Sequence, residues 1–309
     1  MHKYALDFLT VTERAALSAL QWVGKGDKNA ADKAATDTMR EQLNEIDFAG
    51  RVVIGEGEMD EAPMLYIGEK VGTATAPEID IAVDPIEGTT PTINGQENGI
   101  TVIAAAPKGT LFHAPDMYMK KIAVGPRAKG AIDIQAPLLE NMQNVAAALN
   151  KEVSDLRIMV QNRSRHESFI QTMRNAGAKV YLFDNNDIIA SILTNVESAN
   201  IDMMYHIGGA PEGVISAVAL KALDGEIQAQ LMPENEQEIE RCKQMGINDV
   251  HQALSHDDLV SSDECIFSAT GITENALLNG IEQVGHQLNT HSVLITGRNK
   301  RIRFIESVY

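Results

Sequence analysis

Residues 79–89 of this chain read IDIAVDPIEGT, and this stretch decides the fold. Its first five residues predict an apolar β-strand, and Pro85 is expected to end it because proline cannot donate a ladder hydrogen bond. The strand places Asp84 at its carboxyl end, where α/β sheets usually bind ligands. Only two residues separate Asp84 from Glu87, so a tight turn can aim both carboxylates at one point. We therefore predict an α/β fold with a site at this strand end.

Two further residues of the same stretch, Gly88 and Thr89, suit a phosphate. The glycine lets the backbone approach a phosphate closely, and the threonine offers a hydroxyl beside it. The alternative for this motif taken alone is an ordinary proline turn with exposed acids. The strand that precedes the turn favours a functional site over that alternative.

A second acidic cluster, Gly55-Glu56-Gly57-Glu58, also follows an apolar strand directly. In an extended segment Glu56 and Glu58 project to the same side, and the flanking glycines free the backbone. The sequence alone favours the alternative of a surface loop here.

The third candidate is Gly208-Gly209-Ala210-Pro211-Glu212-Gly213. Paired glycines leave a strand, and Pro211 suits the first position of a helix, so free backbone amides are expected to face a ligand. Glu212 then lies at the mouth of that turn. A capped helix start without function explains this segment equally well.

Apolar patterns along the rest of the chain alternate between the periods of helices and strands. Asp32 falls in the first turns of the second predicted helix, and a capping-box pattern at Thr10 and Glu13 marks the start of the first. Residues 234–240 are expected to form a solvated helix face. Helices are predicted at residues 10–22, 30–43, 167–175, 187–194 and 213–223, and strands at residues 51–54, 79–83, 100–106, 157–160, 180–183, 201–205, 265–269, 292–296 and 301–305.

The amino-acid composition argues against some classes of function. Forty-three acidic residues against 26 basic ones give a formal charge of -17. This balance argues against nucleic-acid binding, which needs a basic footprint, but metal ions, helix N-termini and a few arginines can still hold an anionic substrate. No apolar run has the length of a membrane span. With two cysteines and no secretory pattern at the N-terminus, a reducing cytoplasm is the expected location.

Taken together and in order, these motifs resemble the class II fructose-1,6-bisphosphatases. The resemblance covers essentially the whole chain, and it implies the layered α/β/α/β/α fold of the lithium-sensitive, metal-dependent sugar phosphatases. From about Asp155 the sequence alternates between strand and helix patterns, so we expect a metal-binding N-terminal half, residues 1–154, and a substrate-binding C-terminal half, residues 155–309. A homo-oligomer, dimer or tetramer, is the expected assembly. The motifs that carry the resemblance are Gly26–Asp32, Ile54–Glu58, Asp84–Thr89, Ala114–Lys120, Gly208–Gly213, Phe267–Gly271 and the basic C-terminal hairpin.

The resemblance also implies roles for single residues, and the implied metal is Mg²⁺ or Mn²⁺, which prefer oxygen ligands. The implied metal ligands are Asp32, Glu56, Asp84, Glu87 and Glu212. The implied substrate contacts are Glu87, Gly88, Thr89, Tyr118, Arg163, Ser164, Arg165, Asn185, Asn186, Asp187 and Gly209. Thr89 is expected to orient or help to deprotonate the attacking water, with Glu56 assisting. The phosphate that is not cleaved suits the guanidinium forks of Arg163 and Arg165.

Some positions depart from the family pattern. Lys33 and Thr90 replace a usual glycine and a frequent basic residue, Arg163-Ser164 replaces a basic-proline pair, and residues 184–187 read DNND where PDGD is typical. The segment after Met232 is shorter than in many relatives. The departures gather at substrate contacts, whereas the implied metal ligands are retained. Hydrolysis of D-fructose 1,6-bisphosphate to fructose 6-phosphate, a step of gluconeogenesis, is therefore the expected function. The alternatives are sedoheptulose 1,7-bisphosphate or broader sugar phosphate hydrolysis, and a non-catalytic sugar-phosphate sensor.

Overall fold

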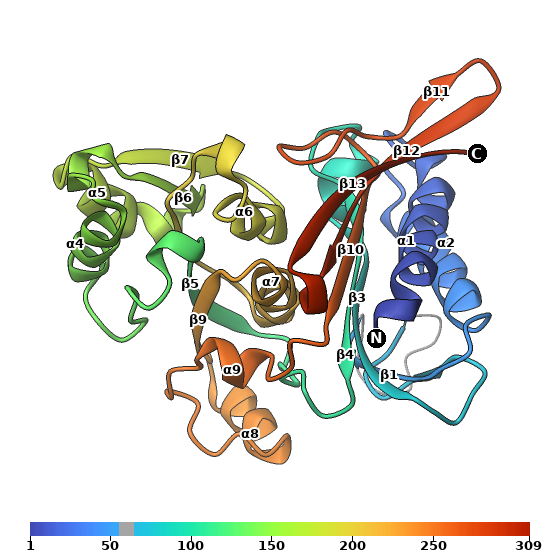
Figure 1. The fold of residues 1–309 in the computed structure, drawn as a ribbon, viewed down its shortest axis with the longest axis horizontal. Helices are drawn as coiled ribbons and strands as arrows, with labels where there is room; N and C mark the ends of the chain where they lie inside the picture. The colour runs from blue at the N-terminus through green and yellow to red at the C-terminus, as the bar shows by residue number, and fades with distance from the viewer. Residues whose placement is uncertain (56–64) are drawn as a thin grey trace. The chain divides into compact units, whose positions relative to one another are not determined.

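The structure, a computed structural model, describes residues 1–55 and 65–309 (Figure 1). The chain forms two compact units. Unit 1 comprises Met1–Leu111 with Ser262–Tyr309, and unit 2 comprises Phe112–Ser261. The divisions fall at 111/112 and 261/262 rather than at the expected 154/155, because the C-terminal strands pair in the same sheet as strands from the first part of the chain. No helix of the described ranges is long and apolar enough to cross a membrane.

Unit 1 is a mixed sheet with helices packed against it. Within the described residues the strand order is β11-β12-β10-β4-β3-β1-β2, and β13 pairs with β12. Helices α1 and α2 cover one face of this sheet (Figure 1). The elements are α1 (Ala5–Leu20), α2 (Lys28–Leu43), β1 (Ala49–Ile54), β2 (Lys70–Val71), β3 (Glu78–Glu87), α3 (Thr89–Ile93), β4 (Ile100–Pro107), β10 (Ile266–Gly271), β11 (Glu282–Val284), β12 (Gln287–Thr296) and β13 (Arg301–Val308).

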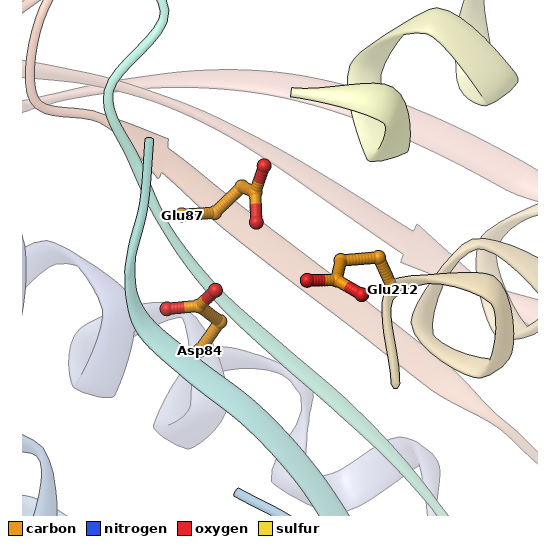
Figure 2. Close-up of side chains that lie close together, drawn as sticks. All are labelled: Asp84, Glu87 and Glu212. Atoms are coloured by element: carbon orange, nitrogen blue, oxygen red, sulfur yellow. The ribbon is translucent and has the colours of Figure 1, made fainter. Parts of the chain in front are cut away.

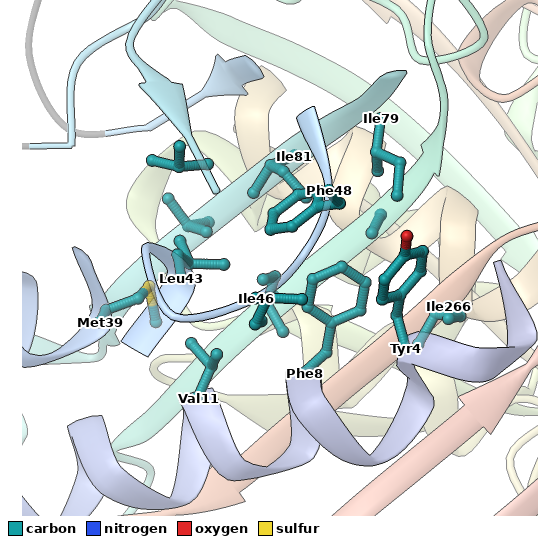
Figure 3. Packing of buried hydrophobic residues seen from close by; sticks show 14 of the residues in the cluster. Tyr4, Phe8, Val11, Met39, Leu43, Ile46, Phe48, Ile79, Ile81 and Ile266 are labelled. Carbon is teal, nitrogen blue, oxygen red and sulfur yellow. The ribbon is translucent and has the colours of Figure 1, made fainter. Parts of the chain in front are cut away.

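The core of unit 1 lies between its helices and its sheet (Figure 3). Tyr4 and Phe8 of the N-terminal segment pack against Phe48, with the Phe8 and Phe48 rings edge to face at 5.7 Å. Fully burying such a side chain stabilises the fold by about 1.5–3 kcal/mol. Burial of Tyr4 and Phe8 also explains why α1 begins at Ala5 and not at the predicted Thr10. Thr10 lies inside the helix, where its hydroxyl donates to the Leu6 carbonyl oxygen.

Unit 2 is a second sheet with helices on both faces, α4 and α5 on one and α6 and α7 on the other (Figure 1). The strand order is β7-β6-β8-β5-β9, and β5 is antiparallel to both of its neighbours. The elements are β5 (Tyr118–Val124), α4 (Leu138–Leu149), β6 (Arg157–Gln161), α5 (Glu167–Asn175), β7 (Lys179–Phe183), α6 (Asp187–Leu193), β8 (Met203–Gly209), α7 (Ala210–Ala222), β9 (Glu226–Leu231), α8 (Glu236–Gln244) and α9 (His256–Leu259). The predicted α/β class is confirmed.

Candidate active site

The first part of the site is the end of β3, which continues through Pro85 to Glu87. The prediction that Pro85 ends the strand is therefore wrong. The pairing with β4 becomes irregular between Asp84 and Glu87, and the Pro85 carbonyl oxygen still accepts a hydrogen bond from the Thr101 hydroxyl at 3.0 Å. This irregularity lets the strand accommodate a residue that has no N–H.

Asp84 and Glu87 lie on the same side of this strand end (Figure 2). A carboxylate oxygen of Asp84 and a carboxylate oxygen of Glu87 lie within 4.8 Å of each other. Asp84 Oδ1 accepts a hydrogen bond from the Ile86 N–H at 3.0 Å, which fixes the turn from inside. Two carboxylates at this separation repel each other and favour a divalent cation between them.

Gly88 and Thr89 follow, at the start of the short helix α3. Gly88 has a left-handed backbone with φ +83°, and an added Cβ would lie only 2.5 Å from the Asn98 carbonyl oxygen. Glycine is therefore required here by both backbone conformation and space. The Thr89 hydroxyl donates to the Ile86 carbonyl oxygen at 2.8 Å, so its oxygen can still accept a hydrogen bond.

Asp32 is the third candidate ligand in unit 1, after Asp84 and Glu87. It lies in the first turns of α2, a helix that Asp27 caps by accepting a hydrogen bond from the Ala30 N–H. Burial raises the pKa of Asp32, and nearby Thr89 and Lys28 offset part of this effect. Its Oδ1 is buried and accepts no hydrogen bond from the described residues. Asp32 is therefore an acid that a bound cation would stabilise. Glu56, the remaining predicted ligand of this part of the chain, lies outside the described residues.

Glu212, also drawn in Figure 2, belongs to unit 2 and lies in the first turn of α7. Helix α7 begins at Ala210, so Gly208 and Gly209 end β8 and Pro211 occupies the second helical position rather than the first. Burial raises the pKa of Glu212, with a further rise from the Asp187 charge. Its Oε2 is buried without a hydrogen-bond partner among the described residues.

Tyr118 and Arg165 lie together in unit 2. The Arg165 guanidinium stacks over the Tyr118 ring at 4.6 Å, and its Nε and Nη2 donate to the Ile207 carbonyl oxygen at 3.1 and 3.0 Å. Tyr118 is the first residue of β5 and pairs with Gly209 of β8. Both side chains remain exposed at one end of the sheet, available to an anionic ligand.

The Arg163 side chain contacts residues 184–187, the segment that is predicted to contact the sugar. Its Nη2 donates to the Asp184 carbonyl oxygen at 2.7 Å and approaches Asn185 Oδ1 at 3.4 Å. The structure therefore brings Arg163 and Asn185 together, and Ser164 starts the 3₁₀ turn that follows Arg163. An amide oxygen in place of a carboxylate leaves the arginine charge less neutralised at this point.

Asn186 stands where the family pattern has glycine, and it has the left-handed backbone that glycine allows, with φ +67°. It also caps α6, because its Oδ1 accepts from the Ile189 N–H at 3.1 Å. The same side chain thus explains both the turn and the start of the helix.

We expect Asn186→Ala to lower the free energy of unfolding by about 2–3 kcal/mol, because it removes a cap worth about 1 kcal/mol and strains a left-handed position by about 1–2 kcal/mol. Asn186→Gly should lose only a few tenths of a kcal/mol. Asn200→Ala is the matched control, since Asn200 has φ +54° and caps no helix N-terminus. Urea denaturation of the three variants measures the difference. Equal losses in both alanine variants would show that the cap contributes nothing.

A buried polar network that the sequence did not indicate lies beneath this turn. Asp187 Oδ2 accepts from Lys121 Nζ at 2.6 Å and lies 3.2 Å from His206 Nε2. Burial by itself raises the pKa of Asp187, but Lys121 and His206 more than offset it, so this pKa lies below its usual range. Burial lowers the pKa of His206 to about 4, so its ring is neutral at pH 7. The only sequence signal was the pair Lys120 and Lys121 in the otherwise apolar segment 117–124, where no strand was predicted.

Comparison with known proteins decides the family. The model of the bacterial, glpX-encoded fructose-1,6-bisphosphatases matches residues 2–309. The chain belongs to this family. The class II fructose-1,6-bisphosphatases are phosphatases, and the resemblance found in the sequence motifs is thereby confirmed.

Relatives within the class II fructose-1,6-bisphosphatases cover nearly the whole chain. Fructose-1,6-bisphosphatase 1 class 2 of Escherichia coli K12 is 48% identical over 99% of this chain and 94% of its own length. A D-fructose 1,6-bisphosphatase class 2/sedoheptulose 1,7-bisphosphatase of Synechococcus is 40% identical over 100% and 96%. Among solved structures, extragenic suppressor protein suhB of Bartonella henselae is 13% identical with a TM-score of 0.38, covering 65% of this chain and 74% of that chain.

Proposed function

We propose that this chain hydrolyses D-fructose 1,6-bisphosphate to D-fructose 6-phosphate and inorganic phosphate, with Mg²⁺ or Mn²⁺ as the cofactor. The observation that carries the proposal is the family match over residues 2–309, in a chain that keeps paired carboxylates at Asp84 and Glu87. The name of the Escherichia coli relative supports fructose 1,6-bisphosphate as the substrate.

The carboxylates fit a divalent cation. Buried oxygens of Asp32 and Glu212 have no hydrogen-bond partner among the described residues, and burial raises the pKa of both acids. Oxygen ligands of this kind suit Mg²⁺ or Mn²⁺ better than softer metals. A bound cation would offset the cost of keeping these acids ionised. The proposed ligands are Asp32, Glu56, Asp84, Glu87 and Glu212.

When bound, the metal supplies neutralisation of the phosphate charge and activation of water. The protein's own groups orient the reactants. Thr89 is proposed to hold the attacking water through its hydroxyl, whose own proton is donated to the Ile86 carbonyl oxygen. Glu56 is proposed to assist in accepting the proton of that water. Glu87 and Gly88 are proposed to contact the phosphate that is cleaved.

The second phosphate and the sugar are proposed to contact unit 2. Arg165 carries an exposed guanidinium group with Tyr118 beneath it, and the Arg163 side chain is partly buried. Guanidinium groups bind phosphate through paired N–H donors. The remaining proposed contacts are Ser164, Asn185, Asn186, Asp187 and Gly209.

A second candidate substrate is sedoheptulose 1,7-bisphosphate. The cyanobacterial relative at 40% identity has both sugars in its name. Asn185, which stands where the family usually has aspartate, changes the hydrogen bonds offered to the sugar. We also propose a cytoplasmic location, supported by two buried cysteines that form no disulfide, and a homo-oligomeric state.

The test is a phosphate-release assay across sugar mono- and bisphosphates with Mg²⁺ or Mn²⁺. We expect the highest kcat/KM for fructose 1,6-bisphosphate, with sedoheptulose 1,7-bisphosphate next. A clear preference for the seven-carbon sugar would transfer the proposal to the second candidate. Absence of turnover on every sugar phosphate, in protein that binds fructose 6-phosphate, would support the sensor alternative.

A further inference from the structure

Lys121 is a fully buried lysine in β5, the strand of unit 2 that lies between β8 and β9. Its ammonium group donates to Asp187 Oδ2 at 2.6 Å and to the Gly209 carbonyl oxygen at 2.7 Å. Lysine is almost never fully buried unless it is paired, because its charge loses hydration. Packing alone therefore does not explain why a charged lysine is buried in this core.

The two acceptors come from two different turns. Asp187 begins α6 and ends the turn of residues 185–187, which we propose to contact the sugar. Gly209 ends β8 and directly precedes α7, whose first turn carries the proposed metal ligand Glu212. One ammonium group thus links the turn proposed to bind substrate to the turn proposed to bind metal. Both turns lie within unit 2, so this link does not depend on unit 1.

The glycines of residues 208–213 leave room for this link. A Cβ at Gly208 would lie 2.5 Å from Asp187 Oδ2, and one at Gly213 would lie 3.2 Å from Lys121 Cδ. A Cβ at Gly209 would lie 2.0 Å from Glu212 Oε2. Side chains at these positions would displace the lysine, its acceptor or the proposed metal ligand. The motif is therefore shaped around the buried polar network, and the Ala210 N–H is not free for a ligand because it donates to the Met117 carbonyl oxygen at 2.9 Å.

The hydrogen bond from Lys121 to Asp187 joins two charged groups. The Asp187 carboxylate is nearly buried, and the neighbouring His206 ring is neutral at pH 7, so Lys121 is the full positive charge that contacts it in unit 2. Hydrogen bonds between charged groups are shorter and stronger than those between neutral groups. Ser191 and Ile189 hold the other end of the turn through bonds to Asp187 O and Asn186 Oδ1. The turn is thus fixed from both sides.

We infer that Lys121 is a positioning residue for the activity proposed above: without touching substrate, it holds the 185–187 turn and the Gly209 turn at one fixed separation. The sugar-binding groups then meet the substrate in a preformed arrangement. This inference rests on the proposed function, and it predicts that the ammonium group contributes to substrate affinity through the placement of the two turns.

The test is Lys121→Met, which keeps a long apolar side chain and removes the charge. We expect the KM for fructose 1,6-bisphosphate to rise at least tenfold. The Kd for fructose 6-phosphate, measured by calorimetry without metal, should rise by a similar factor. The second measurement reports on the sugar-binding turn without any contribution from metal or turnover.

Lys151→Met is the matched control. Lys151 Nζ binds the Asp202 carboxylate at 2.7 and 2.9 Å, and Asp202 immediately precedes β8, at the end of that strand opposite Gly209. This variant removes a second, less buried lysine–aspartate ion pair from the same unit. We expect it to lower thermal stability while KM and Kd stay within twofold of the wild-type values. Equal increases of KM and Kd in both variants would show that the loss of Lys121 acts through general destabilisation. That result would overturn the inference.

Gly213→Ala decides the matter if Lys121→Met does not fold. It keeps the ammonium group but places a Cβ 2.7 Å from Met119 Sδ and 3.2 Å from Lys121 Cδ, so it presses on both side chains, and alanine favours the helix more than glycine does. We expect a several-fold rise in the Kd for fructose 6-phosphate. A folded variant with a Kd within twofold of wild type overturns the inference. Wild-type protein that binds fructose 6-phosphate but does not hydrolyse the bisphosphate contradicts the proposed function instead.

Discussion

Asp84→Asn and Glu87→Gln are each expected to lower kcat by about a hundredfold or more. Each change keeps the shape of the side chain and removes a negative charge from the end of β3. A hundredfold loss corresponds to about 2.7 kcal/mol of transition-state stabilisation, within the several kcal/mol that a metal ion supplies. Steady-state phosphate release at saturating metal and substrate measures the effect, and circular dichroism checks the fold.

Asp80→Asn provides the control on the same strand. Asp80 is buried in β3 and accepts from the Gly109 N–H at 2.6 Å, so it has a structural partner of its own. The same substitution there should cost stability and leave kcat within a fewfold of wild type. A folded Asp84→Asn variant with near-normal turnover would remove Asp84 from the proposed ligands.

Removal of divalent metal is expected to abolish turnover completely and reversibly. Protein dialysed against a chelator should release no phosphate, and added Mg²⁺ or Mn²⁺ should restore activity, with lithium inhibiting the restored enzyme. The reason is that burial raises the pKa of both Asp32 and Glu212, and each acid keeps a buried oxygen without a hydrogen-bond partner among the described residues, so a bound cation would stabilise the ionised form of each. Full turnover in excess chelator would end the metal proposal.

The same experiment has a readout that is independent of catalysis. A cation that binds only the folded chain stabilises it by about 2.7 kcal/mol at a concentration of 100 Kd. We expect Mn²⁺ to raise the midpoint of thermal unfolding, and Asp84→Asn to reduce that rise. A midpoint that is unchanged by Mn²⁺ in the active wild-type protein would show that the metal acts elsewhere than on these acids.

The elements predicted best from sequence are those whose ends have local signals. Residues 167–175 form α5 as predicted, and the predicted pairing of residues 292–296 with 301–305 is confirmed in β12 and β13. The first helix and β3 were predicted too short because tertiary contacts, rather than local preferences, set their ends. Burial of Tyr4 and Phe8 extends the helix, and pairing with β4 carries the strand past Pro85.

Strand β5 shows why part of the site could not be predicted. Its residues Lys120 and Lys121 interrupt an apolar pattern, so the segment does not look like a central strand. In the fold, Lys121 is buried because Asp187 and Gly209 come from distant parts of the chain to meet it. Contacts between residues so far apart in the chain leave no local pattern in the sequence. The left-handed backbone of Asn186, by contrast, depends on a preference of the residue itself, because asparagine adopts this conformation more readily than most residues.

The nesting of unit 2 within the sequence of unit 1 has a consequence for synthesis on the ribosome. Strand β4 ends at Pro107, and its neighbour β10 begins only at Ile266. At about 5–20 residues per second, translation of the intervening segment takes roughly 8–30 s. Throughout this interval the nascent β4 has an open edge with an apolar face, the kind of edge that pairs with other chains. Unit 2 is continuous and can fold during the same interval, so it completes its sheet before unit 1, the unit whose strands emerge first.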